Sequence, residues 1–244
     1  MNVFQRVAAA LRTQGLAGSV ARLLCRLCDP LFDLKYGTET GTLSSLDHLT
    51  LESLNKPRGR PYEPSRVLQL RKMFRIVQEM LPADRVVLDF GCGKGRVLLL
   101  GAESDFRAAR GVEFAEELCA IARKNVAAFQ ARTGTKAEFQ IIKSDVTQYP
   151  VQPDENVFFL FNPFDTVIFE KVLDNIAASL KARPRRLLIV LRLATEEYHR
   201  TLAQRPEFNL ARTFKAWGCD FSVYSGGALA GRSARLPPAR AAAC

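Results

Sequence analysis

The residues best suited to chemistry lie in a glycine-rich segment, residues 89–95 (DFGCGKG), at the end of an apolar run. Glycines let a backbone turn sharply and approach a ligand closely. A dinucleotide-binding loop would have the spacing Gly-x-Gly-x-x-Gly, whereas the spacing here is Gly-x-Gly-x-Gly. Helix amides bind a pyrophosphate, and a carboxylate beside it would repel it. An ammonium group prefers such a carboxylate, so Asp89 favours an amino-acid-bearing nucleoside over a dinucleotide.

Three further polar residues follow or end apolar runs as Asp89 does. They are Glu113, Asp145 and Asn162. In doubly wound sheets, ligands bind at the carboxyl ends of the strands. Four polar strand ends in the same relative position therefore predict one ligand site at one edge of a sheet.

Together these residues resemble a known family. Segment 87–95 looks like motif I of class I S-adenosylmethionine-dependent methyltransferases, and the resemblance extends over roughly residues 62–225. It implies an enzyme of this class with S-adenosyl-L-methionine as cofactor. By the family pattern, Asp89 and the loop glycines bind the methionine end, Glu113 the ribose hydroxyls and Asp145 the adenine amino group. The cofactor-binding residues implied in this region are Asp89, Phe90, Gly91, Cys92, Gly93, Gly95, Glu113, Phe114, Asp145, Val146 and Asn162.

The triplet Asn162, Pro163 and Phe164 is similar to the (D/N)-P-P-(F/Y) motif of amino-group methyltransferases, with one proline missing. In that motif the Asn oxygen accepts a hydrogen bond from the target amine, and the aromatic ring stacks on a planar substrate. The resemblance makes these three residues the catalytic candidates, with an amino group of a protein or small molecule as acceptor. The missing proline and Asp165 argue against a planar base. The alternative is a helix start that Asn162 or Asp165 caps.

Two segments upstream of the glycine-rich loop carry further hypotheses. Residues 61–65 (PYEPS) are similar to a segment that covers the cofactor in several protein-lysine methyltransferases. Tyr62 would then lie over the cofactor's sulfonium, a cation that an aromatic face attracts. The alternative is a helix entry fixed by proline. Residues 33–40 (DLKYGTET) have a more distinctive sequence than a linker would need, and we interpret them as an active-site flap.

The elements expected to position these residues alternate between strand and helix. Such alternation implies a mainly parallel sheet with helices on both faces. We predict a doubly wound α/β fold with a seven-stranded sheet, closed by a C-terminal antiparallel hairpin and preceded by an N-terminal helical extension. The expected strands are 86–88, one ending at 113, 139–142, 157–161, 187–191, 208–215 and 220–224. The expected helices of this domain start near Ser65 and span 96–102, 115–131, 166–180 and 195–204.

The chain divides into three parts in this interpretation. Residues 1–58 form a basic helical extension and connector, 59–225 the methyltransferase domain and 226–244 a disordered tail. Apolar residues among arginines predict one or two helices within 3–28, and 29–63 is loop-like. Such a basic helix can lie on an anionic membrane, pack on its own domain or serve as a transit peptide.

Composition limits the remaining function classes. A net charge of +10 over 244 residues favours an anionic partner such as nucleic acid or a membrane surface, although a basic proteome would give the same balance. Six scattered cysteines match no disulfide or zinc framework and fit a reducing cytoplasm.

His48 and His199 lie far apart, so we expect no metal site. Apolar runs are too short for a membrane-spanning helix. We expect a monomer that is cytoplasmic or peripheral to the membrane. A second basic cluster is formed by Lys181, Arg183, Arg185, Arg186 and Arg192.

Three functions compete on these residues. The first is methylation of an amine on a protein or small molecule. The second is nucleic-acid methylation, which the basic charge and the Asn-Pro-Phe triplet support but for which no target-recognition module is recognisable. The third is a non-catalytic scaffold that binds the cofactor, which Asp89 and Glu113 argue against.

Overall fold

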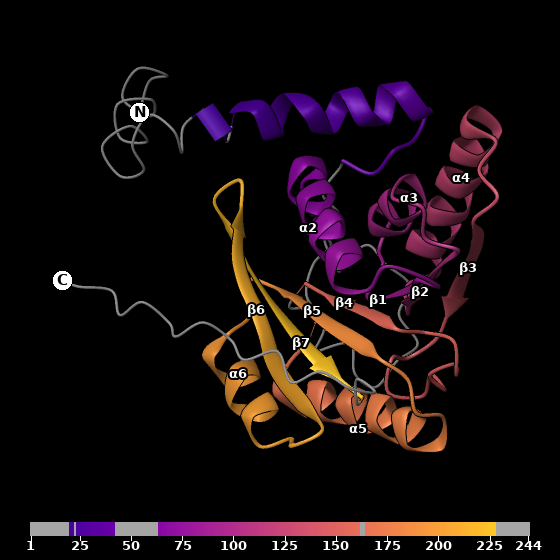
Figure 1. Cartoon of the computed structure of the whole chain (residues 1–244). Coiled ribbons are helices and arrows are strands. Elements are labelled where there is room, and N and C mark those ends of the chain that lie inside the picture. The colour runs from indigo at the N-terminus through magenta and orange to yellow at the C-terminus, as the bar shows by residue number, and fades with distance from the viewer. Residues whose placement is uncertain (1–19, 22, 42–62, 162–163, 228–244) are drawn as a thin grey trace.

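Seven strands form one mixed sheet at the centre of the molecule (Figure 1). The computed structural model describes residues 20–21, 23–41, 63–161 and 164–227. The strand order is β3-β2-β1-β4-β5-β7-β6, with β7 antiparallel to β5 and to β6. The predicted fold class is confirmed, including the closing hairpin. The strands are β1 (Val86–Phe90), β2 (Ala108–Glu113), β3 (Glu138–Lys143), β4 (Val157–Leu160), β5 (Leu187–Arg192), β6 (Phe208–Ala216) and β7 (Cys219–Gly226).

The central strands are apolar on both faces because helices cover both sides of the sheet. On one face, Val87, Phe159 and Val190 belong to the same core cluster as residues of α2 and α3. On the other, Leu88, Phe158 and Ile189 pack with residues of α5 and α6. The helices are α2 (Val67–Met80), α3 (Arg96–Glu103), α4 (Glu116–Thr133), α5 (Thr166–Ala182) and α6 (Glu196–Ala203).

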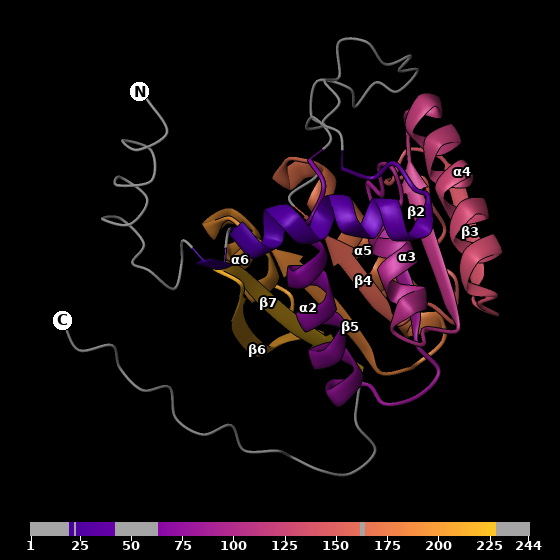
Figure 2. The same cartoon turned by 90° about the horizontal axis from the view of Figure 1, so that it is seen from above.

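An N-terminal helix lies outside α2 and α3 and crosses both of them (Figures 1 and 2). It is helical at residues 20–21 and 23–36, so the expectation of a loop from residue 29 is wrong as far as Tyr36. Pro30 disfavours a helix interior because it has no N–H to donate. Tertiary packing overrides this preference, since Asp29, Phe32 and Tyr36 are buried against the domain. The predictions for residues 3–19 and for 228–244 lie outside the described residues.

The N-terminal helix is attached to the domain at two places. The Asp29 carboxylate accepts a hydrogen bond from the Val67 backbone amide at 2.9 Å and thereby caps α2, and it also pairs with Arg66 at 2.7 Å. At the other end, the Tyr36 hydroxyl donates to Glu103 at 2.8 Å, and the Tyr36 ring lies 4.6 Å from that of Phe129. These contacts fix which face of the helix points inward.

Candidate functional site

The glycine-rich loop joins β1 to α3 at the carboxyl edge of the sheet. Its glycines Gly91, Gly93 and Gly95 have φ angles of 81°, 52° and 84°, in the left-handed region that other residues seldom adopt. Gly95 is the N-cap of α3. The strand extends two residues beyond its expected end, so Asp89 lies within β1 and the turn begins at Gly91.

A fourth glycine, Gly111 on β2, allows the loop to approach the neighbouring strand. A Cβ atom at Gly111 would lie 2.5 Å from both the Cβ and the Sγ of Cys92. Such a distance is not possible between non-bonded atoms, so this position requires glycine as long as Cys92 keeps its place. The sequence pattern gave no signal for this role, because Gly111 lies in the middle of an ordinary strand.

Glu113, the last residue of β2, connects three segments of the site. Its Oε2 accepts a hydrogen bond from the Gly93 amide at 3.0 Å, and its Oε1 accepts from the Phe114 and Ala115 amides at 3.0 and 3.1 Å. Burial raises the pKa of Glu113, and the three amides partly oppose this effect. The carboxylate therefore holds the glycine loop against the start of α4.

Asp89 lies beside Gly111 in the sheet register and is only 3% exposed. Within the described part of the chain, no hydrogen-bond donor reaches its carboxyl group. Burial raises the pKa of Asp89 well above its ordinary value, and the nearby Glu113 raises it further. A buried carboxylate is stable as an anion only with a compensating partner. A cation beside Asp89 would provide such a partner.

The segment after β3 contributes the third predicted acid. The Asp145 carboxylate accepts hydrogen bonds from the Thr147 amide at 2.9 Å and the Thr147 hydroxyl at 2.8 Å, which fixes a local turn. The preceding Ser144 amide donates to the Glu113 carbonyl at 3.0 Å. This bond places the Asp145 segment next to the end of β2, at the edge of the sheet that carries Asp89. Val146 is buried in the core.

The predicted acceptor end is only partly described. Tyr62, Asn162 and Pro163 lie outside the described residues. Phe164 is buried in the core, and its carbonyl accepts a hydrogen bond from the Tyr198 hydroxyl at 2.8 Å. Asp165 accepts from the Ile168 amide at 3.1 Å and is the N-cap of α5, so the capping role is confirmed for Asp165.

Arg192, at the carboxyl end of β5, lies over the Phe161 ring, 3.7 Å from its centroid. The side-chain oxygen of Gln69 on α2 accepts hydrogen bonds from Nε and Nη2 of Arg192 at 3.3 and 3.2 Å. Nη1 of Arg192 is buried and has no hydrogen-bond partner within the described residues. The basic cluster expected around residues 181–192 is therefore not one surface, because Arg192 is buried and Arg185 is occupied by the carbonyls of Glu155 and Ser179.

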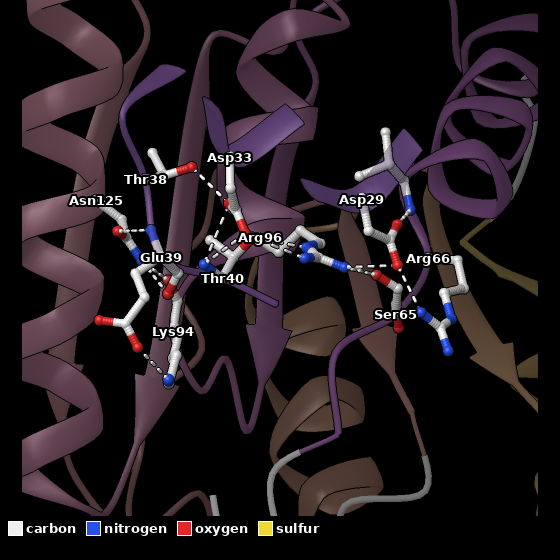
Figure 3. A network of polar contacts seen from close by, with 11 residues as sticks. Asp29, Asp33, Thr38, Glu39, Thr40, Ser65, Arg66, Lys94, Arg96 and Asn125 are labelled. Atoms are coloured by element: carbon white, nitrogen blue, oxygen red, sulfur yellow. Dashed lines mark hydrogen bonds and ion pairs between the residues drawn. The ribbon is translucent and has the colours of Figure 1, made fainter. Parts of the chain in front are cut away.

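Sequence analysis missed a polar network that ties the N-terminal helix to the glycine-rich loop (Figure 3). We call residues 37–41, which follow this helix, the strap. Asp33 of the helix accepts hydrogen bonds from the Thr38 hydroxyl and the Thr40 hydroxyl, both at 2.7 Å. The Thr40 hydroxyl in turn accepts from Nε of Arg96, the first residue of α3, at 2.7 Å. The residues suspected of forming a flap thus contact the loop directly, and their action as a flap stays a prediction.

Arg96 is the centre of this network and is 2% exposed. Its Nη1 donates to the Ser65 carbonyl at 3.0 Å and lies 3.5 Å from Asp29. Its Nη2 lies 3.6 Å from Asp33. Two carboxylates of the N-terminal helix therefore neutralise the guanidinium of Arg96, the residue that directly follows the glycine-rich loop.

Lys94, inside the glycine-rich loop, also pairs with a carboxylate from the N-terminal part of the chain. Its ammonium lies 2.8 Å from the Glu39 carboxylate of the strap. The Asn125 amide on α4 donates to the carbonyls of Lys94 and Glu39 at 2.9 and 3.2 Å, and its oxygen accepts from the Glu39 amide at 2.8 Å. Strap, loop and α4 are thus joined by one buried side chain.

This fold is that of the class I S-adenosylmethionine-dependent methyltransferases. A putative methyltransferase from Escherichia coli (yhhF) superposes with a TM-score of 0.50 at 18% identity, covering 70% of this chain and 93% of that one. The magnesium protoporphyrin IX methyltransferase of Synechocystis, solved with bound SAM, reaches 0.48 at 16% identity, over 66% and 80%. An RNA methyltransferase of Salinibacter ruber, in complex with S-adenosyl-L-homocysteine, gives 0.48 at 16%, over 72% and 100%.

The family model described as methionine biosynthesis protein MetW matches residues 71–194, just over half of the chain. The chain therefore belongs to this family. No curated protein sequence matches it. The family match covers the glycine loop, Glu113 and Asp145 and ends just beyond Arg192, whereas the N-terminal helix and strap lie outside it.

Proposed function

We propose that this protein is an S-adenosylmethionine-dependent methyltransferase that acts on an amino group. The observation that carries the cofactor assignment is Asp89, a buried carboxyl group that no donor of the described residues reaches. It lies beside a second buried carboxyl group at the carboxyl edge of a methyltransferase-like sheet. The cofactor carries an ammonium and a sulfonium, and either cation would compensate a carboxylate there. A dinucleotide offers no such cation and brings a pyrophosphate instead.

Glu113 is the residue suited to the ribose, and its present bonds limit how it can act. A carboxylate has about four lone-pair positions, and three are occupied by the amides of Gly93, Phe114 and Ala115. One hydroxyl can be accepted without any change. To accept both ribose hydroxyls, Glu113 must release one amide, and the Gly93 amide is the one in the glycine loop. We therefore propose that the loop moves slightly on cofactor binding.

The cofactor supplies an electrophilic methyl group, and the protein supplies approach geometry and exclusion of water. Asp89 is in register with Phe159, and Phe159 with Val190. Phe161 and Arg192, two residues further on, therefore fall on the same face of the sheet as Asp89 by strand alternation. We propose that Asn162, directly after Phe161, accepts a hydrogen bond from the acceptor amine and orients its lone pair. An amine needs only to lose a proton, so a strong base in the site is not required.

The test is transfer of labelled methyl from S-adenosylmethionine to a cell lysate treated separately with protease or nuclease. We expect protease, or removal of small molecules, to abolish labelling, and the Asn162→Ala variant to bind cofactor normally but to lose turnover. Loss of labelling with nuclease would assign the acceptor to nucleic acid. Normal cofactor binding without labelling of any fraction would favour the scaffold function.

A further inference from the structure

The N-terminal helix is apolar on two faces, only one of which is buried. Its inner face packs on the domain through Cys25, Phe32 and Tyr36. A helix that is apolar all round is normally buried, and an exposed apolar face marks an interaction site. We call the outer set the leucine face: Val20, Leu23, Leu24, Leu27, Leu31 and Leu34, which are between 39% and 75% exposed.

The leucine face cannot turn inward without breaking the contacts of the opposite face. Asp29 caps α2, and Tyr36 is bonded to Glu103. Arg132 on α4 donates hydrogen bonds to the carbonyls of Leu34 and Lys35, at 3.2 and 2.8 Å, where the helix ends. These contacts therefore keep the leucines on the outer side of the helix in the described part of the chain.

The charges around the leucine face are basic. The two acidic residues of the described helix, Asp29 and Asp33, face inward, where they compensate Arg66 and Arg96. The exposed charged residues of its described part are Arg26 and Lys35, and the Lys35 ammonium already donates a hydrogen bond to the Tyr36 hydroxyl at 2.7 Å. A second copy of the described helix would bring no exposed acidic residue to meet these charges. An anionic surface would neutralise them, and leucines between basic residues suit the boundary between lipid headgroups and acyl chains.

We propose that the leucine face docks on an anionic phospholipid membrane. The helix would lie flat, with its leucines in the boundary layer and Arg26 beside lipid phosphates. Its length, about 25 Å at about 1.5 Å per residue, suits this orientation. None of the described helices is long and apolar enough to cross a membrane. The proposal is independent of methyl transfer, since its test needs neither cofactor nor acceptor.

The experiment is co-sedimentation of the full chain with vesicles of phosphatidylcholine, with and without phosphatidylglycerol. We expect binding to the anionic vesicles and weaker binding at high salt. The double variant Leu27→Gln/Leu31→Gln should weaken binding about 100-fold, since each buried leucine contributes about tenfold. Arg26→Glu should weaken it about tenfold. The matched control is Leu210→Gln on β6, a leucine of similar exposure outside the N-terminal helix, which should bind as wild type.

Circular dichroism should show all four proteins folded with the same thermal midpoint, because the substituted side chains are solvent-exposed. Failure of the folded wild-type chain to bind anionic vesicles would overturn the proposal. Equal binding by the double variant would overturn it as well. A wild-type dimer that the double variant converts to a monomer would assign the leucine face to a second copy instead.

Discussion

Replacing Arg96 with methionine should destabilise the protein and also weaken binding at the proposed cofactor site. The substitution keeps an unbranched side chain but removes the guanidinium that faces Asp29 and Asp33. Breaking a buried ion pair from one side typically costs about 3–5 kcal/mol, because the remaining charge loses its partner. Both carboxylates keep other donors here, Arg66 and Val67 for Asp29 and Thr38 and Thr40 for Asp33, so we expect the lower end, about 3 kcal/mol.

For a chain of this size, about 1 kcal/mol shifts the thermal midpoint by about 2–4 °C, so Arg96→Met should lower it by about 6–12 °C. The matched control is Arg123→Met on α4, whose pair with Glu116 is exposed and contributes at most about 1 kcal/mol. Thermal denaturation followed by circular dichroism measures both. Equal midpoints for the two variants would refute the role given to the buried network. Cofactor affinity at a temperature where both are folded should fall only in Arg96→Met, whereas a loss confined to stability would mean that the network does not position the loop.

Three further predictions follow from the site and its surroundings. Burial raises the pKa of Asp89 in the free protein, and a bound cation lowers it. Cofactor binding should therefore release a proton, and the affinity should increase as pH rises towards the raised pKa. Calorimetry in buffers of different ionisation enthalpy measures the released proton, and no release would contradict the assignment. Gly111→Ala places a Cβ atom against Cys92 and should weaken cofactor binding. Gly134→Ala, at a left-handed position in open space, should lower only the free energy of unfolding. Equal cofactor affinities for the two variants would count against the packing argument. Hydrogen bonds from Arg110 and Arg107 hold the pKa of Asp154 below its ordinary value. The contribution of Asp154 to folding stability is therefore present above the ordinary pKa and is lost as pH falls through the lowered pKa. Acid unfolding curves of wild type and Asp154→Asn should converge at low pH, and parallel curves would exclude Asp154 as a source of acid sensitivity.

The sheet and the positions of the acids could be predicted from sequence because they depend on local patterns. Buried strands are short apolar runs, and a ligand-binding edge appears as a polar residue at the end of each run. Asp89 and Glu113 are both found at that edge, with their carboxyl groups buried. The predicted end of β1 was two residues short, because an aspartate inside a strand is not distinguishable from one after it.

The polar network could not be predicted in the same way. Thr40 and Arg96 are 56 residues apart, and Glu39 and Asn125 are 86 apart, so no periodicity connects them. The N-terminal helix was ended too early because Pro30 disfavours a helix locally, while the contacts that override it come from α2, α3 and α4. Gly111 was missed because its reason, close approach to Cys92, exists only in three dimensions. These features depend on tertiary packing rather than on local preference.

The measurement that tests the central claim most directly is calorimetric titration of S-adenosylmethionine into the wild-type chain and Asp89→Asn. We expect one site per chain in the wild type. Asp89→Asn should bind about 10–150-fold more weakly, as expected for loss of a hydrogen bond to a charged group worth about 1.5–3 kcal/mol. The same variant should be more stable than wild type at neutral pH, because it removes a buried carboxyl whose raised pKa makes folding less favourable as pH increases. Asp105→Asn, on an exposed turn after α3, is the control and should bind as wild type. Absence of binding by the wild-type chain, or equal affinity in Asp89→Asn, would contradict the account.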